Sequence, residues 1–186
     1  MKFLKKTDIK VDLNQAIKDM NTVLCNCNFD WINGITPGNS VGLNYRKGAE
    51  NPWTDNFGSL YDKKQNKFIA KETDFSEWVP DMPTYTQGII EDLAKKENFK
   101  IGRIRYLKLE KRSGISVHFD MEIRYHLVLK TNKHAFMGET VQGEKHVAEC
   151  FHMPADGYFY RADTTREHFV YNGGWEDRIH LVIAAI

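Results

Sequence analysis

The stretch Ser116-Val-His-Phe-Asp-Met-Glu-Ile-Arg-Tyr-His-Leu-Val-Leu-Lys130 places four chemically active side chains within nine residues and then continues as an apolar run. In an extended strand, residues two apart project to the same side. His118 and Asp120 can therefore direct an imidazole and a carboxylate to one point. Arg124 and His126 can direct a guanidinium and an imidazole to another. The stretch thus combines a strand pattern with two pairs of functional side chains.

The sequence on both sides of this stretch predicts only strands and turns from residue 101 to residue 186. Short runs rich in β-branched and aromatic residues alternate there with Gly, Asn and Asp, which is typical of a β-sandwich or a β-barrel. The expected strands cover residues 104–109, 116–120, 124–131, 135–137, 147–153, 158–161, 167–171 and 178–184.

The first hundred residues differ in character. Apolar residues at a helical spacing predict an amphipathic helix over residues 12–25, with Asp12 as its N-cap, and a second helix over Thr86–Lys96. Short strands are expected at 41–45 and 67–71, and Asn33-Gly34 and Pro37-Gly38 predict a loop between the first helix and the first of these strands.

We therefore expect a mainly β protein: a double-stranded β-helix, or jelly roll of the cupin type, supported by N-terminal α-helices. Residues 1–186 are expected to form a single domain, with a helical and loop-rich part to residue 100 and the jelly-roll core from 101. The segment 46–62 is rich in Gly, Asn, Pro and aromatic residues. It is either a binding loop, with Trp53, Ser59 and Tyr61 as candidates, or a packed surface loop.

Composition excludes several classes of function. The chain of 186 residues has 26 basic and 25 acidic side chains, and this balance indicates neither a nucleic-acid partner nor an acidic membrane surface. There is no run of about 18 apolar residues for a membrane-spanning helix, and the start lacks the apolar segment of a secretory signal. Three cysteines fit a reduced compartment better than a disulfide framework. We expect a cytoplasmic protein.

A His-x-Asp pair is two thirds of the two-histidine, one-carboxylate face that holds non-haem Fe(II). His168 differs from the other histidines in its setting, 50 residues after His118 at a turn that enters a strand. His134, His146 and His152 have no charged residue at a telling spacing, and we interpret them as surface or ordinary core residues.

Arg178 follows His168 by ten residues and begins a strand in which Arg178, His180, Val182 and Ala184 share one face. An inward-pointing arginine requires an anion, because a buried unpaired guanidinium is very costly. Two alternatives remain open at this point. His180 either points into the same cavity or is structural. The arginines at 124 and 178 either hold a ligand or form ion pairs with nearby acidic residues, namely Glu122, Glu167, Glu176 or Asp177.

The combined order of His-x-Asp, Arg-x-His, a distant His and a final Arg resembles that of the Fe(II)- and 2-oxoglutarate-dependent dioxygenases. Within them it is most similar to the branch of aspartyl/asparaginyl β-hydroxylases and bacterial proline 3-hydroxylases, and the resemblance covers residues 102–186. It implies a metal site and a co-substrate site: iron ligands His118, Asp120 and His168; a cation for the distal carboxylate of 2-oxoglutarate, Arg178; and further co-substrate contacts, Arg124 and His126.

The resemblance implies a hydroxylase that consumes O2 and 2-oxoglutarate, releases succinate and CO2, and acts on an amino acid or on an amino-acid side chain in a protein. Aspartyl hydroxylases lack the carboxylate ligand, whereas this chain keeps Asp120, as proline hydroxylases do. Halogenases of the wider superfamily leave that position uncharged, so Asp120 favours hydroxylation. The alternatives are a catalytically inactive jelly-roll binding module and a cupin-type metalloenzyme that does not use 2-oxoglutarate. No feature of the sequence selects a particular substrate.

Overall fold

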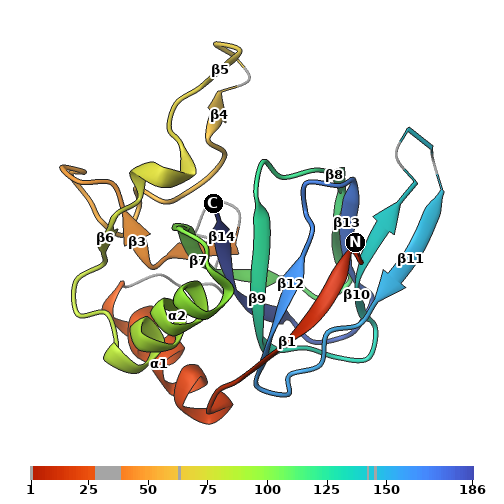
Figure 1. Ribbon diagram of the computed structural model, residues 1–186, viewed down its shortest axis with the longest axis horizontal. Coiled ribbons are helices and arrows are strands. Elements are labelled where there is room, and N and C mark those ends of the chain that lie inside the picture. The colour runs from red at the N-terminus through yellow and green to blue at the C-terminus, as the bar shows by residue number, and fades with distance from the viewer. Residues whose placement is uncertain (1, 28–38, 63, 142, 145) are drawn as a thin grey trace. The chain divides into compact units, whose positions relative to one another are not determined.

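The computed structural model describes residues 2–27, 39–62, 64–141, 143–144 and 146–186 (Figure 1). The loop predicted around Asn33-Gly34 and Pro37-Gly38 lies outside the described residues. The chain divides into two compact units, Met1–Leu13 with Lys108–Val182, and Asn14–Leu107 with Ile183–Ile186. The boundary at residue 107 lies close to the division predicted at residue 100. That all 186 residues work as a single domain stays a prediction.

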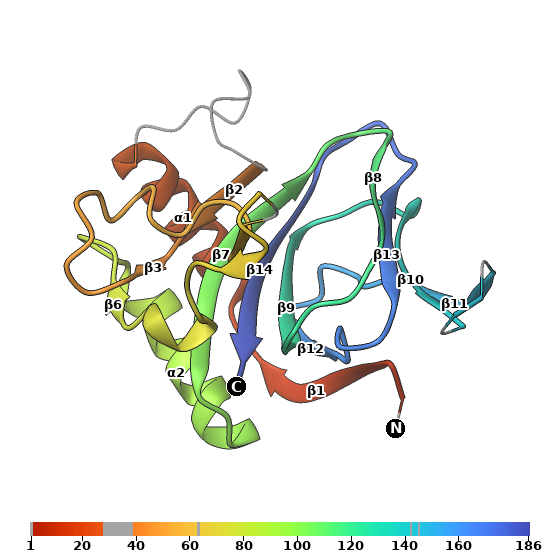
Figure 2. The ribbon, with the colours of Figure 1, turned by 90° about the horizontal axis from the view of Figure 1, so that it is seen from above.

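The first unit consists of antiparallel strands in two sheets, which face each other in Figure 2. Its first sheet is part of a six-stranded sheet and begins with β1 (Leu4–Lys10), β12 (Tyr158–Ala162), β9 (Ile123–Lys130) and β14 (Arg178–Ala185), in that order. Its second sheet holds β11 (Val147–Phe151), β10 (Ala135–Thr140), β13 (His168–Asn172) and β8 (Ser113–His118), in that order. The strands β7 (Ile101–Leu109) and β14 each belong in part to both units.

The path of the chain is that of a double-stranded β-helix. It runs from β8 in the second sheet to β9 in the first, returns through β10 and β11, crosses to β12, returns to β13 and ends in β14. The predicted mainly β jelly roll, with its helices confined to the first hundred residues, is confirmed. Each strand predicted after residue 101 is present with small shifts at its ends.

The interior of this unit holds both its apolar core and several polar side chains. The core joins residues of the two sheets, among them Val128, Tyr160, Ala162, Met137 and Val170. The register pairs Tyr160 with His126 and Ala162 with Arg124, and paired residues of adjacent strands project to the same face. His126 and Arg124 therefore point into the same interior as the core residues.

Strand β1, which pairs with β12 at the edge of the first sheet, was not predicted from the sequence. Four of its seven residues are exposed, and the buried Thr7 donates its hydroxyl hydrogen to the carbonyl of Phe159 at 3.0 Å. Three lysines dominate its composition and obscure the strand pattern. Lysine-rich sequences are nevertheless common in edge strands, where charge discourages pairing with other chains.

The second unit contains the two predicted helices, α1 (Leu13–Asn26) and α2 (Thr84–Glu97). The buried face of α1 centres on Ala16, Met20 and Val23. The predicted stripe is offset from this face, because Leu13, Ile17 and Leu24 are only half-buried. The buried carboxylate of Asp19 accepts hydrogen bonds from the amide and hydroxyl of Thr86 at 3.0 and 2.8 Å, which joins α1 to α2.

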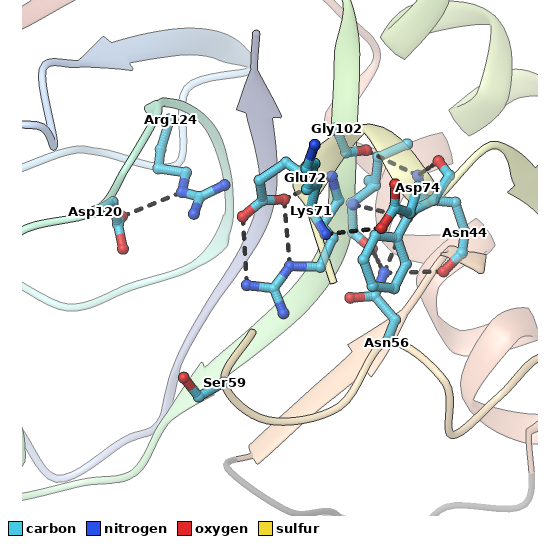
Figure 3. Close-up of polar contacts among 12 residues, drawn as sticks. Asn44, Asn56, Ser59, Lys71, Glu72, Asp74, Gly102, Asp120 and Arg124 are labelled. Atoms are coloured by element: carbon cyan, nitrogen blue, oxygen red, sulfur yellow. Dashed lines mark hydrogen bonds and ion pairs between the residues drawn. The ribbon is translucent and has the colours of Figure 1, made fainter. Parts of the chain in front are cut away.

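Short strands and one 3-10 helix complete the second unit: β2 (Ser40–Gly42), β3 (Asn44–Tyr45), β4 (Tyr61–Asp62), β5 (Lys67–Phe68), η2 (Glu72–Asp74) and β6 (Glu77–Trp78). The single strand predicted at 41–45 is two strands, because β2 pairs with β7 and β3 with β6. The side chain of Asn44 donates to the carbonyls of Phe75 and Gly102, both at 2.8 Å, and so fixes this division (Figure 3). No helix in the described ranges is long and apolar enough to cross a bilayer.

Asn172, at the end of β13, organises the turn that leads into β14. Its side-chain amide donates to the carbonyls of Leu109, Glu110 and Glu176 at 3.2, 3.1 and 2.8 Å, and its oxygen accepts from Asn132 at 2.9 Å. Asn172 is 0% exposed, and its one amide joins the end of β7 to the turn after β13. The amide therefore fixes the position at which β14 begins.

We expect Asn172→Leu to lower the free energy of unfolding by about 3 kcal/mol, because it removes all the side-chain hydrogen bonds of a fully buried amide. Urea denaturation followed by circular dichroism measures this loss. Lys133→Ala, on the exposed surface of the preceding loop, is the control and should change the value by less than about 0.5 kcal/mol. Equal stability of the two variants would show that the turn does not depend on Asn172.

Candidate metal centre

Strand pairing brings the two histidines of the candidate centre together. His118 on β8 lies opposite His168 on β13, and the centroids of their rings are 4.3 Å apart. The register of these strands shifts between His168 and Val170, since Val170 pairs with Ile115. Two residues of β13 thus span three residues of β8, which is the count of a β-bulge. The bulge thus adjusts the register of β8 so that His118 lies opposite His168.

Asp120 completes the group from the loop after β8. Its amide donates to the carbonyl of Thr164 at 2.7 Å, and the hydroxyl of the buried Thr164 donates to the carbonyl of Glu122 at 2.6 Å. These bonds hold the loop so that one potential ligand atom from each of His118, Asp120 and His168 lies within 4.8 Å of the others. Thr164 was not identified from the sequence, where nothing distinguishes it from an ordinary turn residue.

Both histidines are oriented through their second ring nitrogen. Nδ1 of His118 lies 2.8 Å from the carbonyl of Ser116, and Nδ1 of His168 lies 2.9 Å from the carbonyl of Arg166. A carbonyl can only accept, so Nδ1 carries the hydrogen in each ring and Nε2 keeps its lone pair. This tautomer is the one that a metal-binding histidine adopts when its other nitrogen donates to a backbone carbonyl.

The carboxylate of Asp120 is oriented by Arg124. Nε of Arg124 donates to Oδ2 of Asp120 at 3.1 Å (Figure 3). The arginine side chain is 7% exposed and that of Asp120 27%. The ion pair therefore lies at the border of the interior, and it fixes one carboxylate oxygen while the other can serve a metal.

The donor set fits Fe(II). Two imidazole nitrogens and one carboxylate oxygen on one side of a metal, with the remaining positions open, make the facial arrangement of non-haem Fe(II) oxygenases. A structural zinc site would need four protein ligands, and the group identified among the described residues has three. The geometry thus agrees with the ligand set that the sequence resemblance implied.

Arg178 has the environment of an anion-binding residue. It is 7% exposed, and burial lowers its pKa to about 9, so the guanidinium remains charged at neutral pH. Within the described ranges, no carboxylate forms an ion pair with it. Glu176 pairs with Lys130 at 3.4 Å, and Asp177 accepts from the amide of Lys111 at 3.0 Å. The alternative of a structural ion pair therefore does not apply to Arg178, and a dicarboxylate fits this unbalanced charge.

Two neutral histidines form a row that begins at Arg178. Nη2 of Arg178 lies 3.1 Å from Nδ1 of His180, which lies 3.4 Å from Nδ1 of His126. Burial is the main cause that lowers the pKa of both histidines well below the usual 6.5, and the positive charge of Arg178 adds to it. Burial also lowers the pKa of His168. All three imidazoles are therefore neutral at neutral pH.

All six predicted site residues lie in the first unit, four of them buried and two, His118 and Asp120, half-buried. The structure also answers the question that the sequence left open for His180, which points inward and contacts Arg178. His134 and His146 are exposed, as expected for surface residues. The segment 46–62 belongs to the second unit, where Arg46 and Asp55 form an ion pair at 2.6 Å and Ser59 is exposed. Its role in substrate selection stays a prediction.

Comparison with known proteins identifies a family. The model of the family described as aspartyl/asparaginyl β-hydroxylase matches residues 46–186. The match begins well before residue 102, where the resemblance was expected to begin, and so takes in most of the second unit. No curated protein matches the chain.

Among solved structures, AviO1 from Streptomyces viridochromogenes Tue57 has a TM-score of 0.57 at 12% identity, covering 98% of this chain and 88% of its own. A Pseudomonas putida prolyl-4-hydroxylase has a TM-score of 0.49 at 9% identity, over 98% and 91% of the two chains. An oxidoreductase of the 2OG-Fe(II) oxygenase family from Burkholderia pseudomallei has a TM-score of 0.45 at 18% identity, and the match covers 59% of this chain and 60% of that protein. At these identities the likeness concerns the fold alone.

The buried histidines make the stability of the metal-free protein depend on pH. Their pKa is depressed in the folded state, so the unfolded chain binds more protons below pH 6.5. Stability is therefore complete above this pH and falls as the pH decreases, by up to about 1.4 kcal/mol per pH unit for each histidine. Urea denaturation between pH 7.5 and 5.5 measures the slope. His180→Asn should reduce it and the exposed His134→Asn should not, and identical slopes would contradict the assignment.

Proposed function

This chain belongs to the aspartyl/asparaginyl β-hydroxylase family and is a 2-oxoglutarate-dependent oxygenase; we propose that it hydroxylates an amino acid or an amino-acid side chain in a protein. The reaction converts the substrate C–H bond, O2 and 2-oxoglutarate into the alcohol, succinate and CO2. The observation that carries the proposal is a three-ligand group, His118, Asp120 and His168, in the same interior as the unbalanced charge of Arg178.

The proposal assigns the metal to these three ligands and the far carboxylate of 2-oxoglutarate to Arg178. When bound, Fe(II) and 2-oxoglutarate supply the oxidising chemistry, whereas the protein supplies binding and orientation. Nε2 of His118 and of His168 and one oxygen of Asp120 hold the metal. Arg124 fixes the other oxygen of Asp120 through Nε, and its guanidinium, with His126, also faces the co-substrate. A bidentate guanidinium–carboxylate contact gives Arg178 a geometry that lysine lacks.

The unbalanced charge of Arg178 favours this function over the other two candidates. A cupin-type enzyme without 2-oxoglutarate has no dicarboxylate to bind there, and a binding module that has lost turnover has no reason to keep a complete ligand set. A charged group without a counter-ion in the interior costs stability. It is therefore best explained by a ligand that supplies the opposite charge.

The type of reaction, the element of substrate selection and the location complete the proposal. Asp120 favours hydroxylation, since halide binding would need its position to be uncharged. The segment 46–62 is the proposed element of substrate selection. Cys25, Cys27 and Cys150 are all thiols rather than halves of disulfides, which supports a reduced, cytoplasmic setting. Neither a nucleic acid nor a membrane is proposed as a partner.

The first test is turnover without added substrate. Protein loaded anaerobically with Fe(II) and then given 2-oxoglutarate and air should form succinate slowly, as detected by mass spectrometry. His168→Ala should lose metal binding by at least about tenfold, measured with Co(II) by titration, together with succinate formation. His134→Ala is the matched control and should keep both. Succinate formation by His168→Ala at the wild-type rate would contradict the ligand assignment.

The second test concerns the co-substrate. Arg178→Lys should raise the KM for 2-oxoglutarate by about tenfold or more, because a point charge cannot replace the two parallel hydrogen bonds of a guanidinium. The affinity for Co(II) should stay unchanged. Arg161→Ala removes an arginine from the outer face of β12 and should leave the KM unchanged. An unchanged KM in the Arg178 variant would show that the arginine has another role.

A further inference from the structure

Arg178, His180 and His126 form one hydrogen-bonded row in the interior of the first unit. Arg178 and His180 alternate along β14 and His126 lies on the neighbouring strand β9. The three residues are 7%, 0% and 6% exposed. The distances along the row are 3.1 Å from Nη2 of Arg178 to Nδ1 of His180, and 3.4 Å from there to Nδ1 of His126. The proposed function uses Arg178 and His126 but leaves His180 without a task.

The hydrogen bonds assign the tautomers of both histidines. A guanidinium has only donors, so Nδ1 of His180 must accept the N–H of Arg178, and the hydrogen of this ring is on Nε2. Nδ1 of His126 faces the same acceptor. It must therefore carry a hydrogen, because otherwise two lone pairs would face each other. His126 is then left with a bare lone pair on Nε2. Both rings are neutral, in agreement with their lowered pKa.

The Nε2 atoms of the two rings complete the description. Both are buried and have no hydrogen-bond partner among the described residues. With the tautomers assigned above, Nε2 of His180 is a donor and Nε2 of His126 is an acceptor. Buried polar atoms of native proteins are almost always paired. A polar group bound next to the two rings would supply the missing hydrogen-bond partners. The row therefore offers one donor and one acceptor to a polar group bound beside it.

We propose that His180 is a positioning residue for the co-substrate arginine: as a neutral imidazole supported by His126, it holds Nη2 of Arg178 and directs the remaining guanidinium N–H groups to the dicarboxylate. This inference rests on the proposed function, because it takes Arg178 as the group that binds 2-oxoglutarate. Arg178 makes no other side-chain hydrogen bond to a described residue, so His180 is the group that sets the orientation of its guanidinium.

The neutral charge of His180 is the essential part of this role. A carboxylate at this position would also accept the hydrogen bond of Arg178. It would, however, balance the charge that attracts the co-substrate and would repel the bound dianion. An apolar side chain would preserve the charge but would leave the guanidinium without an orienting partner. An imidazole with a lone pair on Nδ1 provides orientation and preserves the charge.

The test compares three substitutions of similar size. In His180→Asn, the amide oxygen of the new side chain can occupy the place of Nδ1 as a neutral acceptor. His180→Asp offers the same geometry with a charge, and His180→Leu offers neither. The dissociation constant of 2-oxoglutarate is measured by calorimetry on protein loaded with Zn(II), which is redox-inert, so no turnover occurs. We expect His180→Asn to stay within about threefold of the wild type, and the Asp and Leu variants to bind about tenfold or more weakly.

A spectroscopic readout tests the tautomer directly. Ring-nitrogen NMR of the wild-type protein at pH 7 should show a non-protonated Nδ1 and a protonated Nε2 for His180, with the reverse for His126. His134→Asn serves as the assignment control and should leave both signals unchanged. A protonated Nδ1 on His180 would overturn the proposal, since that nitrogen could not accept from Arg178.

The outcomes separate this inference from the proposed function. If His180→Asp binds 2-oxoglutarate as tightly as His180→Asn, the positioning role is wrong while the function stands. If the wild-type protein does not bind 2-oxoglutarate, the proposed function fails, and so does the role of His180 toward that ligand. If His180→Leu does not fold, the Asn and Asp variants decide the question alone. If the Asp variant does not fold either, the NMR signals of the wild type decide it, because they confirm or overturn the tautomer.

Discussion

The candidate centre depends on one cross-strand contact, the pairing of His118 on β8 with His168 on β13. Side chains alternate between the two faces of a strand, so a slip of one residue would turn one of these rings away from the other. The bulge in β8 meets this constraint locally, because two residues of β13 lie opposite three residues of β8 and His118 still pairs with His168. Asp120 then needs only a short loop, fixed by Thr164, to reach the same point. Strand register thus brings the two histidines together, and the loop after β8 adds the carboxylate.

The interior of the first unit distributes charge unevenly. Arg124 lies against Asp120, whereas Arg178 faces two imidazoles that burial keeps neutral. The carboxylate of Glu139, which pairs in register with His168, is engaged by Arg166. Among the described interior residues, the positive charge of Arg178 on β14 therefore remains unbalanced. A buried charge is tolerated when a bound ligand supplies the opposite charge. A dicarboxylate that also binds a metal would do this, because one end would face Arg178 and the other end the three-ligand group.

Much of the fold and of the site could be predicted from the sequence, because both follow from spacing. The period of two places Arg124 with His126 and Arg178 with His180, and it defines the strands after residue 101. Asp120 lies beyond the end of β8, so its position near His118 depends on the loop and not on strand alternation. The strand at Leu4–Lys10 could not be predicted, because its partner lies about 150 residues away and its lysines resemble a solvated terminus. The contacts of Arg124 and His180 could not be predicted either, since hydrogen bonds depend on the direction of side chains within the folded jelly roll. Thr164 acts through its backbone carbonyl and its hydroxyl, for which composition provides no signal.

Strand β1 has a consequence for the order in which the protein forms. Leu4 pairs with Ala162, and the first unit takes its strands from both sides of the second, which occupies most of residues 14–107. During synthesis the helices of the second unit can form early. Strand β1 can pair with β12 only after about 150 further residues have been made. Such long-range pairing slows folding and leaves an unpaired strand exposed in the meantime. The lysines that make β1 hard to recognise in the sequence also discourage aggregation of this unpaired strand.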